Sequence, residues 1–582
     1  MDDKFYSSEK SIQMLIALLK FHNIKKIVAS PGTTNVTFVA SLMHDSFFEM
    51  YSSVDERSAA YIACGLAAES GEPVVLTCTG ATASRNYVPG LTEAYYRKLP
   101  ILAVTSTQDA SRIGNLFPQV IDRRQQFNDI VNLSEQIPAV TSEKDEWDVN
   151  LRLNRAVLAL THRGGGPVHI NLATTYSRDF SIKELPSTRV IRRYTQNDEL
   201  PAIPNGRVAI FVGNHKRFSD KETQAVERFC ETHNAVVFCD HTSGYYGKYR
   251  VQFAIVMDQI MQVTNLRNLE LLVHLGEVSG DSGTSGLKPK RVWRISEDGA
   301  LRDTFHCLEN VFEMPESVFF NMYSENDTVK QMDFYEDCQN ELAKVRGAIK
   351  ELPFSNTWIA QQTAHRIPQN SILHLSILNT LRNWNMFEID SSVVRSSNTG
   401  GFGIDGILST LVGASLNDKK KLSFVVIGDL AFFYDMNVAG NRHVGNNVRI
   451  LLVNNGRGQE FRNYNHPGAA FGDECDLYIA AGGHYGNKSA TLVRHYAEDL
   501  GFEYLSASNK EEYLKSVERF VTPELTEKPM LLEVFTESEN ESRALQMIYN
   551  TVSNAAGNAR SFVINVLGDK GVKLAKKMMN KD

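Results

Sequence analysis

The chain has 582 residues, enough for three or four domains at about 100–200 residues per domain. Hydrophobic residues make up 42% and charged residues 22%, which is typical of globular proteins and excludes disordered and fibrous classes. Lys and Arg number 61 against 68 Asp and Glu, for a formal charge of −7, so nucleic acid is not expected as a partner.

Cysteine usage and the absence of long apolar runs indicate the compartment. The seven cysteines are odd in number and lack C-x-x-C spacing, which argues against a disulfide framework and against structural zinc. The polar start MDDKFYSSEK leads into an amphipathic helix, and no apolar run reaches the roughly 18–20 residues that span a bilayer. We expect a cytoplasmic protein that is not inserted in a membrane.

The first segment alternates predicted helices and strands. Apolar residues at i, i+3, i+4 and i+7 within 12–19 predict a helix, and KKIVASPG (25–32) then predicts a buried strand that Pro31 and Gly32 end. The alternation continues with a helix at 55–71, a strand at 73–80, a helix at 86–97 and strands at 100–107 and 164–173. Such alternation predicts a parallel sheet covered by helices.

Two further blocks have the same α/β character. A polar stretch at 186–206 has the composition of a linker, and the block after it contains RVAIFVGNH, NAVVFCDHTSG, LELLVHLGEVSGDSG and RVWRISED. After a second polar stretch at 351–357, the third block contains SILHLS, LSFVVIGDLAFF and VRILLVNNGRG. The predicted fold is α/β with three doubly wound parallel-sheet domains: 1–185, 190–350 and 355–548, followed by a Lys-rich C-terminal tail at 549–582.

The first and third blocks share one plan. Residues 74–107 and 424–456 both read strand, turn, helix, strand, at low sequence identity. The comparison suggests an ancient internal duplication, although any two doubly wound domains share this plan.

The third block carries the sharpest chemical signal. Asp429 follows a hydrophobic strand, and the next strand ends at Asn454 and Asn455. In open parallel sheets ligands bind at the carboxyl edge, where these side chains would emerge together. A carboxylate, a carboxamide and a backbone carbonyl are hard oxygen donors that suit Mg²⁺ bound to a diphosphate.

This pattern resembles the G-D-G…N-N signature of thiamine-diphosphate enzymes. The string GDLAFFYDMN…LLVNNGRGQEF is most similar to the branch that contains the succinyl-enolpyruvyl-hydroxycyclohexene-carboxylate synthase of menaquinone biosynthesis, with acetolactate synthases more distant. The resemblance implies that Asp429 and Asn455 bind Mg²⁺ together with the main-chain oxygen of Arg457. Leu430 stands where the general signature has its final Gly, which that branch tolerates. The resemblance also implies that Asp429, Leu430 and Asn455 contact the cofactor.

The first block resembles the complementary half of such a site. Glu56, in VDERSAAYIACGLA, corresponds to the glutamate that hydrogen-bonds the aminopyrimidine ring and activates the cofactor. Taken alone, an acidic residue in a first helical turn is more often a cap that complements the helix dipole. The neighbouring TGATASRNYVPGLTEAYYRKLPILAVT resembles the family's T-S-G-T-A-x-x-N-x-x-P-A pattern, which implies that Thr79 and Asn86 bind the cofactor.

Two more positions follow family motifs. The segment Gly403–Gly406 resembles the end of R-G-A-S-G-I-D-G, in which the isoleucine wedges between the two cofactor rings; Ile404 would do so here. Gln119, in FPQVIDRRQQF, corresponds to a glutamine that contacts the covalent intermediate.

The chain departs from its branch where substrate carboxylates are bound. Relatives have the motif S-P-G-S-R, and the last two positions of this motif are Thr33 and Thr34 in this chain. The arginine that opens their R-G-A-S-G segment corresponds to Thr399. A neutral threonine cannot form the bidentate pair that arginine forms with a carboxylate. We therefore expect a changed donor or acceptor, with Thr34 among the substrate residues. The candidate carboxylate-binding cations are Arg382, Arg85, Arg395 and Arg457.

The middle block lacks a complete G-x-G-x-x-G with a following acidic residue. No flavin (FAD) is therefore expected, and a nicotinamide oxidoreductase is the weakest reading. The paired histidines of simple 2-oxo-acid decarboxylases are also missing, which favours carbon–carbon ligation.

The resemblance implies a thiamine-diphosphate- and Mg²⁺-dependent enzyme, a transferase or lyase. It would decarboxylate a 2-oxo acid and pass the resulting acyl carbanion to an unknown small-molecule acceptor. The alternatives are a decarboxylase that releases an aldehyde and a catalytically silent protein that kept the fold. In this family Glu56 of one subunit would meet the diphosphate site of its partner, so the chain is predicted to form an obligate homodimer, or a homotetramer as a dimer of dimers.

Overall fold

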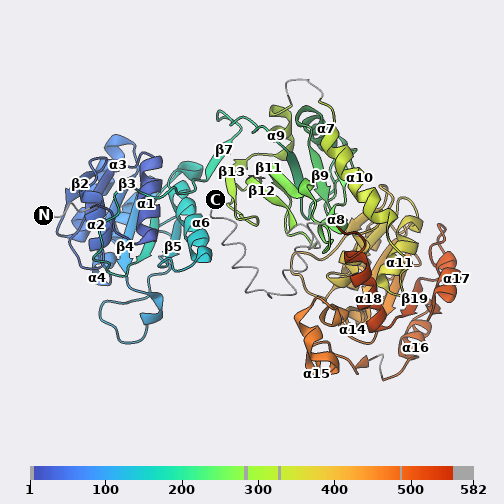
Figure 1. The fold of residues 1–582 in the computed structure, drawn as a ribbon. Coiled ribbons are helices and arrows are strands. Elements are labelled where there is room, and N and C mark those ends of the chain that lie inside the picture. Colours follow the sequence, from blue (N-terminus) through green and yellow to red (C-terminus); the bar gives the residue numbers. More distant parts are fainter. Residues whose placement is uncertain (1–4, 281–285, 325–329, 486–487, 555–582) are drawn as a thin grey trace. The chain divides into compact units, whose positions relative to one another are not determined.

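The computed structural model describes residues 5–280, 286–324, 330–485 and 488–554. The chain divides into two compact units: unit 1 comprises residues 1–198 and 299–313, and unit 2 comprises residues 199–298 and 314–582 (Figure 1). The end of the GEVSGDSG segment and the predicted tail beyond Asn554 lie outside the described residues. The domain boundaries expected from the sequence stay a prediction.

The first sheet belongs to unit 1 and is parallel. Its strands lie in the order β2 (Glu49–Ser52), β1 (Lys26–Ala29), β3 (Val74–Cys78), β4 (Ile101–Thr107), β6 (Val168–Ala173) and β5 (Leu133–Ile137). The helices of this segment are α1 (Lys10–Phe21), α2 (Val36–Met43), α3 (Glu56–Ser70), α4 (Thr82–Asn86), α5 (Val88–Arg97) and α6 (Glu143–Ala159).

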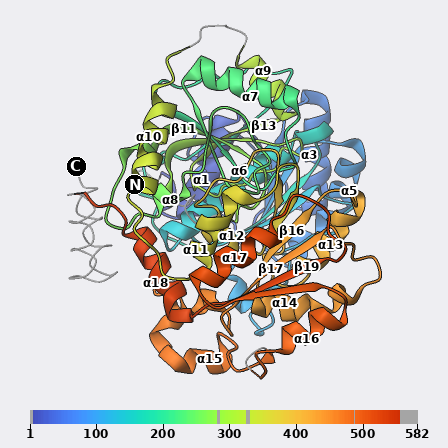
Figure 2. The ribbon, with the colours of Figure 1, turned by 90° about the vertical axis from the view of Figure 1, so that its right-hand side faces the viewer.

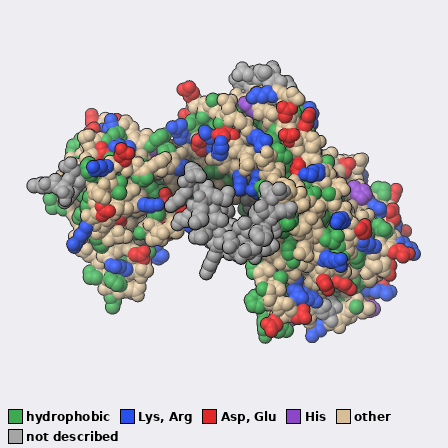
Figure 3. Space-filling view, viewed as in Figure 1, with side chains coloured by type: hydrophobic (Ala, Val, Ile, Leu, Met, Phe, Trp, Pro, Cys, Tyr) green, Lys and Arg blue, Asp and Glu red, His purple; other side chains and the backbone are tan. Residues whose placement is uncertain are grey.

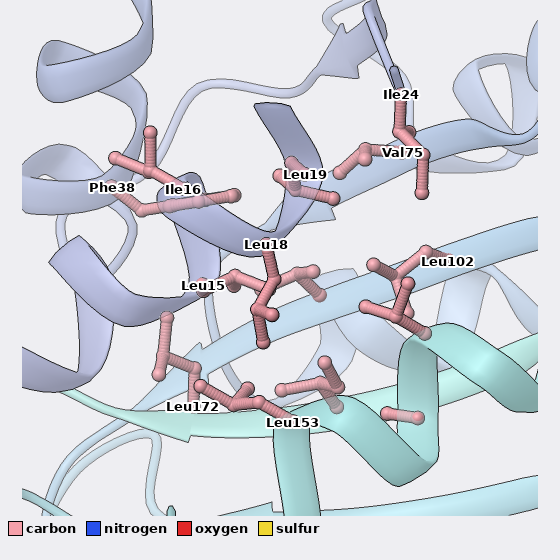
Figure 4. Close-up of a cluster of buried hydrophobic side chains, with 14 of the residues drawn as sticks. Leu15, Ile16, Leu18, Leu19, Ile24, Phe38, Val75, Leu102, Leu153 and Leu172 are labelled. Atoms are coloured by element: carbon pink, nitrogen blue, oxygen red, sulfur yellow. The ribbon is translucent and has the colours of Figure 1, made fainter. Parts of the chain in front are cut away.

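Helices cover both faces of the first sheet. On one face α1, α2 and α6 bury a cluster that includes Leu15, Leu18, Phe38, Leu102 and Leu153 (Figure 4). On the other face the alanines of α3 pack with α5 against β3 and β4. Because both faces of a doubly wound sheet are covered, its central strands are continuous apolar runs. This explains why β3 and β4 were predictable from the sequence.

His169, on β6, makes the stability of unit 1 sensitive to acid. Its ring is buried between two hydroxyls, with Nε2 2.8 Å from Oγ1 of Thr105 and Nδ1 2.8 Å from Oγ of Ser134. Burial and, to a smaller extent, repulsion by the nearby Arg123 together lower the pKa of His169 to about 3. The folded state therefore holds a neutral imidazole, whereas the unfolded chain takes up a proton near pH 6.5.

We expect the contribution of His169 to be complete above pH 6.5 and to be lost as the pH falls toward 3, at about 1.4 kcal/mol per pH unit. In His169→Gln the free energy of unfolding should decrease less steeply as the pH falls from 6.5 to 4. The difference in slope should correspond to the uptake of about one proton fewer on unfolding. Denaturant titrations at several pH values measure this slope. A slope equal to that of the wild type would contradict the assignment of His169 as a neutral buried group.

The middle sheet has seven strands, whereas each of the other two has six. Its strands lie in the order β10 (Arg250–Val251), β9 (Val236–Cys239), β8 (Val208–Val212), β11 (Asn268–Leu275), β12 (Lys288–Ile295), β13 (Leu308–Glu313) and β7 (Arg192–Thr195). Its helices are α7 (Asp220–His233), α8 (Ala254–Met257), α9 (Glu316–Met322) and α10 (Asp333–Gly347). The edge strand β7 lies within the polar stretch that the composition indicated as a linker. An edge strand has one solvated side, which permits the charged residues of RRYT.

The third sheet lies in unit 2 and is also parallel. Its strands lie in the order β15 (Val394–Ser396), β14 (Ile372–Leu375), β16 (Ser423–Gly428), β17 (Val448–Asn454), β19 (Met530–Phe535) and β18 (Glu503–Ala507), and Figure 2 shows β16, β17 and β19 side by side. Its helices are α11 (Asn356–Thr363), α12 (Asn379–Trp384), α13 (Ile407–Asn417), α14 (Asp429–Asp435), α15 (Cys475–Tyr478), α16 (Leu492–Asp499), α17 (Lys510–Phe520) and α18 (Ser538–Tyr549).

The first and third sheets have the same strand order. When the strands of each sheet are numbered along the chain, both orders read 2-1-3-4-6-5. The common plan predicted for the two blocks is thus confirmed, and β3 and β4 correspond to β16 and β17. Within the described residues no helix combines the length and the apolar character needed to cross a bilayer.

Candidate active site

The first half of the candidate site lies in unit 1, at the start of α3. The side chain of Asp55 caps this helix by accepting hydrogen bonds from the backbone N–H groups of Arg57 and Ser58. The cap holds Glu56 in the first turn, where Asn86 Nδ2 donates to Glu56 Oε2 at 3.4 Å. Glu56 is partly exposed and Asn86 is exposed. Two residues predicted to bind the cofactor are therefore brought together.

Thr34 and Thr79 meet at the carboxyl edge of the same sheet. The Thr34 hydroxyl lies 2.5 Å from that of Thr79, donates to the Ser106 carbonyl at 3.0 Å and accepts from the Gly80 N–H at 3.2 Å. Thr34 is almost completely buried. Its hydroxyl joins the ends of β3 and β4, and this is the role that the structure gives to a residue predicted to contact substrate.

Gln119 and Arg85 lie on the exposed side of this edge. A Cβ at Gly80 would come within 3.1 Å of the Gln119 carbonyl oxygen, so glycine permits the segment after β4 to approach the end of β3. Gln119 itself is exposed and has a positive φ of 61°. Arg85 is exposed on α4.

The second half of the candidate site lies in unit 2, where β16 passes into α14. Asp429 is the first residue of α14 and is 4% exposed. Burial raises the pKa of Asp429 to about 7, although backbone N–H donors oppose this shift, among them Leu430, whose N–H lies 2.8 Å from Oδ1. Among the described residues no cation forms an ion pair with Asp429. The result is a buried carboxyl group whose charge is not neutralised by the protein.

Asn455 offers an oxygen at the end of the neighbouring strand. Its Oδ1 is buried and has no hydrogen-bond partner among the described residues, and the register pairs Gly428 with Val453, so Asp429 and Asn455 leave the same edge. A buried amide oxygen without a hydrogen bond is unfavourable unless a ligand or an ion contacts it. The two donors fit Mg²⁺, which binds oxygen and keeps its other positions for water and phosphate. The role of the Arg457 main-chain oxygen as a third Mg²⁺ ligand stays a prediction.

Glu533 positions this turn and was not predicted. It is a single acidic residue in the otherwise apolar strand β19, and its carboxylate accepts from Asn454 Nδ2 at 2.7 Å and from the Tyr504 hydroxyl at 2.8 Å. Asn454 Oδ1 in turn accepts from the Gly456 N–H at 3.2 Å. The turn that carries Asn455 is thereby fixed to the sheet. An isolated acid inside an apolar run was the available sequence signal.

Ile404 lies in the loop before α13 and is partly buried. The helix α13 begins three residues later, at Ile407, after Gly406, whose φ is +74°. Asp435, at the end of α14, accepts from the N–H and hydroxyl of Ser409, both at 2.6 Å. This contact joins α13 to α14 and so fixes the loop of Ile404 relative to the helix that begins with Asp429.

Most of the predicted substrate arginines already have partners. Arg382 forms an ion pair with Glu460 and Arg457 forms one with Asp476. The guanidinium carbon of Arg395 lies 4.3 Å from the ring centre of Tyr246. Acidic neighbours therefore neutralise two of the candidates.

The described residues contain no group of three or more His, Cys, Asp or Glu that could hold a metal ion. The predicted set of one carboxylate, one amide and one backbone carbonyl stays a prediction.

Comparison with known proteins identifies the class. Residues 10–131 match the family model described as the thiamine pyrophosphate enzyme N-terminal TPP-binding domain, and this range contains Glu56, Thr79, Asn86 and Gln119. Together with the three parallel sheets, the match makes the chain a thiamine-diphosphate-dependent enzyme of 2-oxo acid chemistry.

Full-length relatives define the family. The chain is 30% identical over 575 residues to the 2-succinyl-5-enolpyruvyl-6-hydroxy-3-cyclohexene-1-carboxylate synthase of Phocaeicola vulgatus, covering 94% of this chain and 99% of that protein. The synthase of Bacteroides fragilis is 30% identical over 569 residues, covering 94% and 100%, and that of Bacteroides thetaiotaomicron is 30% identical over 570 residues, covering 94% and 99%. The chain belongs to this synthase family, whose chemistry couples decarboxylation to carbon–carbon bond formation on an acceptor.

Proposed function

We propose that the chain catalyses the Mg²⁺- and thiamine-diphosphate-dependent decarboxylation of a 2-oxo acid and transfers the remaining acyl group to a small-molecule acceptor. The observation that carries the Mg²⁺ assignment is the buried, un-neutralised carboxyl group of Asp429 at the same sheet edge as the unsatisfied Oδ1 of Asn455. A divalent cation would satisfy both groups.

The two half-sites support a division of labour. Asp429 and Asn455 would hold the diphosphate through the metal at the ends of β16 and β17. Glu56 would hold a proton at a ring nitrogen of the aminopyrimidine, with Asn86 keeping its carboxylate in place. Thiamine diphosphate supplies the electron sink that allows the substrate carboxylate to leave as carbon dioxide. The protein contributes orientation and exclusion of water.

The product need not be that of the curated relatives. Thr34 and Thr399 stand where the branch is expected to carry arginines, and the Thr34 hydroxyl is engaged within the protein. Arg382 and Arg457 are paired with carboxylates. We therefore propose that the donor or the acceptor differs from that of the synthases named above.

Carbon dioxide release tests the proposal. The full-length protein, supplied with thiamine diphosphate and Mg²⁺, is given a panel of 2-oxo acids with and without aldehyde and unsaturated acid acceptors. We expect cofactor-dependent release and a ligated product. If aldehyde is the only product with every acceptor, the enzyme is a decarboxylase. If the cofactor binds and no acid is consumed, the protein is catalytically silent.

We further propose that the active form is a homodimer. On α3 the small residues face the core, whereas Tyr61 and Ile62 are 47% and 44% exposed; on α5 Tyr96 is 70% exposed. Large apolar side chains that face outward next to a candidate catalytic residue are typical of a covered surface. A second copy of the chain would cover it and bring Glu56 to the partner's diphosphate site, and a dimer of dimers stays the larger alternative.

Ile62→Asp should therefore shift the protein toward the monomer and lower carbon dioxide release in parallel, because a charge in an apolar interface must be desolvated. Sedimentation velocity measures the association state. Ile62→Val, which keeps an apolar side chain at the same position of α3, should leave the dimer intact. A dimer that tolerates Ile62→Asp would contradict the proposed interface.

We also propose a cytoplasmic location. All seven cysteines are free, and six of them are buried, as expected for a protein that matures in a reducing compartment.

A further inference from the structure

Arg123 is a buried cation that the proposed mechanism does not use. It lies in the segment between β4 and β5 and is 1% exposed. Its Nη2 donates to the Ser106 carbonyl at 3.1 Å, and its Nε and Nη1 have no hydrogen-bond partner among the described residues. Two of the three guanidinium nitrogens are therefore unsatisfied.

No carboxylate neutralises this charge. Within the described part of the chain Arg123 forms no ion pair. Burial, with a smaller contribution from repulsion by Arg85, lowers the pKa of Arg123 to about 10. A buried guanidinium without a counterion is strongly unfavourable, and proteins retain such groups where an anion completes them.

Arg123 lies at the edge that carries the first half-site. The Ser106 carbonyl accepts from both Arg123 and the Thr34 hydroxyl. A Cβ at Gly80 would come within 3.4 Å of Arg123 Nη2 and within 3.1 Å of the Gln119 carbonyl oxygen. The guanidinium of Arg123 therefore belongs, through Nη2, to the same cluster as Thr34, Thr79 and Gln119.

We propose that Arg123 binds a carboxylate of the substrate and determines specificity for acids that carry it, an inference that rests on the proposed function. A guanidinium presents two parallel N–H donors that match a carboxylate. Nη2 carries a second N–H besides the one that Ser106 accepts, and this N–H together with the unsatisfied Nε or Nη1 supplies such a pair of donors. Arg123 would thus provide a carboxylate-binding cation that Thr34 cannot provide.

The carboxylate that Arg123 binds is one that survives the reaction. A cation that bound the leaving carboxylate would stabilise the ground state more than the transition state, because the negative charge leaves that group during decarboxylation. Arg123 is therefore assigned to a carboxylate that is retained in the product, on the donor or on the acceptor.

Arg123 is almost completely buried, so the protein around it must move to admit this carboxylate. Residues 108–131 form a long connection between β4 and β5 that contains only the short 3₁₀ turn Ala110–Arg112. It exposes Leu116 and Phe127, and Figure 3 shows hydrophobic side chains at the lower end of unit 1. Long connections of this kind often act as lids over binding sites.

Isothermal titration with glutarate tests the site without requiring turnover, because glutarate carries two carboxylates and no keto group. The full-length protein should bind glutarate, and Arg123→Gln should weaken binding about 10- to 100-fold, the loss expected for hydrogen bonds to a charged group. Arg124→Gln is the matched control, since the adjacent Arg124 is exposed and pairs with Asp122 at 2.6 Å. It should bind glutarate like the wild type.

Thermal unfolding separates a binding role from a structural one. Removal of an uncompensated buried charge should leave Tm unchanged or raised in Arg123→Gln, and the Ser106 carbonyl keeps Thr34 as a donor. If Arg123→Gln does not fold, Arg123→Lys, which retains the charge and loses the paired donors, should fold and bind glutarate with an intermediate affinity.

The outcomes distinguish the inference from the proposed function. Failure of the wild type to bind glutarate, or equal affinity in the wild type and the Arg123 variants, overturns the assignment of Arg123. Arg123-dependent binding without carbon dioxide release from any 2-oxo acid supports the carboxylate site and refutes the proposed reaction.

Discussion

Glu56→Gln is expected to lower the rate of carbon dioxide release by about 10²- to 10⁴-fold, the range for loss of a positioned proton-transfer group. Glutamine has the same shape but does not exchange a proton near neutral pH. The substitution should leave α3 intact, because Asp55 rather than Glu56 caps the helix. The affinity for thiamine diphosphate should change little, since Asp429 and Asn455 are assigned to the diphosphate.

Single-turnover measurements and calorimetric titration of the cofactor separate these two effects. Glu69→Gln, which makes the same chemical change in the last turn of the same helix, should behave like the wild type. Near-normal turnover in Glu56→Gln would remove the proton-transfer role from Glu56. Loss of cofactor binding with normal unfolding would assign Glu56 to binding instead.

The fold was predictable where burial makes the sequence pattern strong. The central strands β3, β4, β16 and β17 are buried on both faces and consist mainly of apolar residues. The edge strand β7 was not predicted as a strand, because one side faces solvent and the sequence RRYT is mostly polar. The pattern of repeated elements also predicted the common plan of the two outer sheets. It did not give the full strand order, which depends on long-range pairing.

The candidate site was predictable where a motif places residues at strand ends, as for Asp429, Asn455 and Glu56. Partners far apart in sequence were not visible: the ion pair of Arg382 with Glu460 joins residues 78 positions apart, and it changes the reading of Arg382 as a substrate residue. Arg123 lies in a connection without periodicity. Only the structure shows that it is buried and that its Nε and Nη1 are unsatisfied among the described residues.

The two aspartates of α14 should respond oppositely to replacement by asparagine. Asp429→Asn removes a buried carboxyl group that has no ion pair, and asparagine Oδ1 still accepts from the Leu430 N–H, so the free energy of unfolding should be unchanged or raised. The Mg²⁺-dependent affinity for thiamine diphosphate should fall by at least about 100-fold, since even residues that support metal ligands contribute about 10- to 100-fold.

Asp435→Asn is the matched comparison at the other end of the same helix. Asp435 accepts two short hydrogen bonds from Ser409, so its replacement should lower the free energy of unfolding by about 1–3 kcal/mol. Because Asp435 lies at the opposite end of α14 from Asp429, the Mg²⁺-dependent part of the cofactor affinity should change less than in Asp429→Asn. Urea denaturation and cofactor titration with and without Mg²⁺ measure both quantities. If Asp429→Asn destabilised the fold and left Mg²⁺-dependent affinity intact, Asp429 would be a structural residue, and the metal site at the ends of β16 and β17 would have to be abandoned.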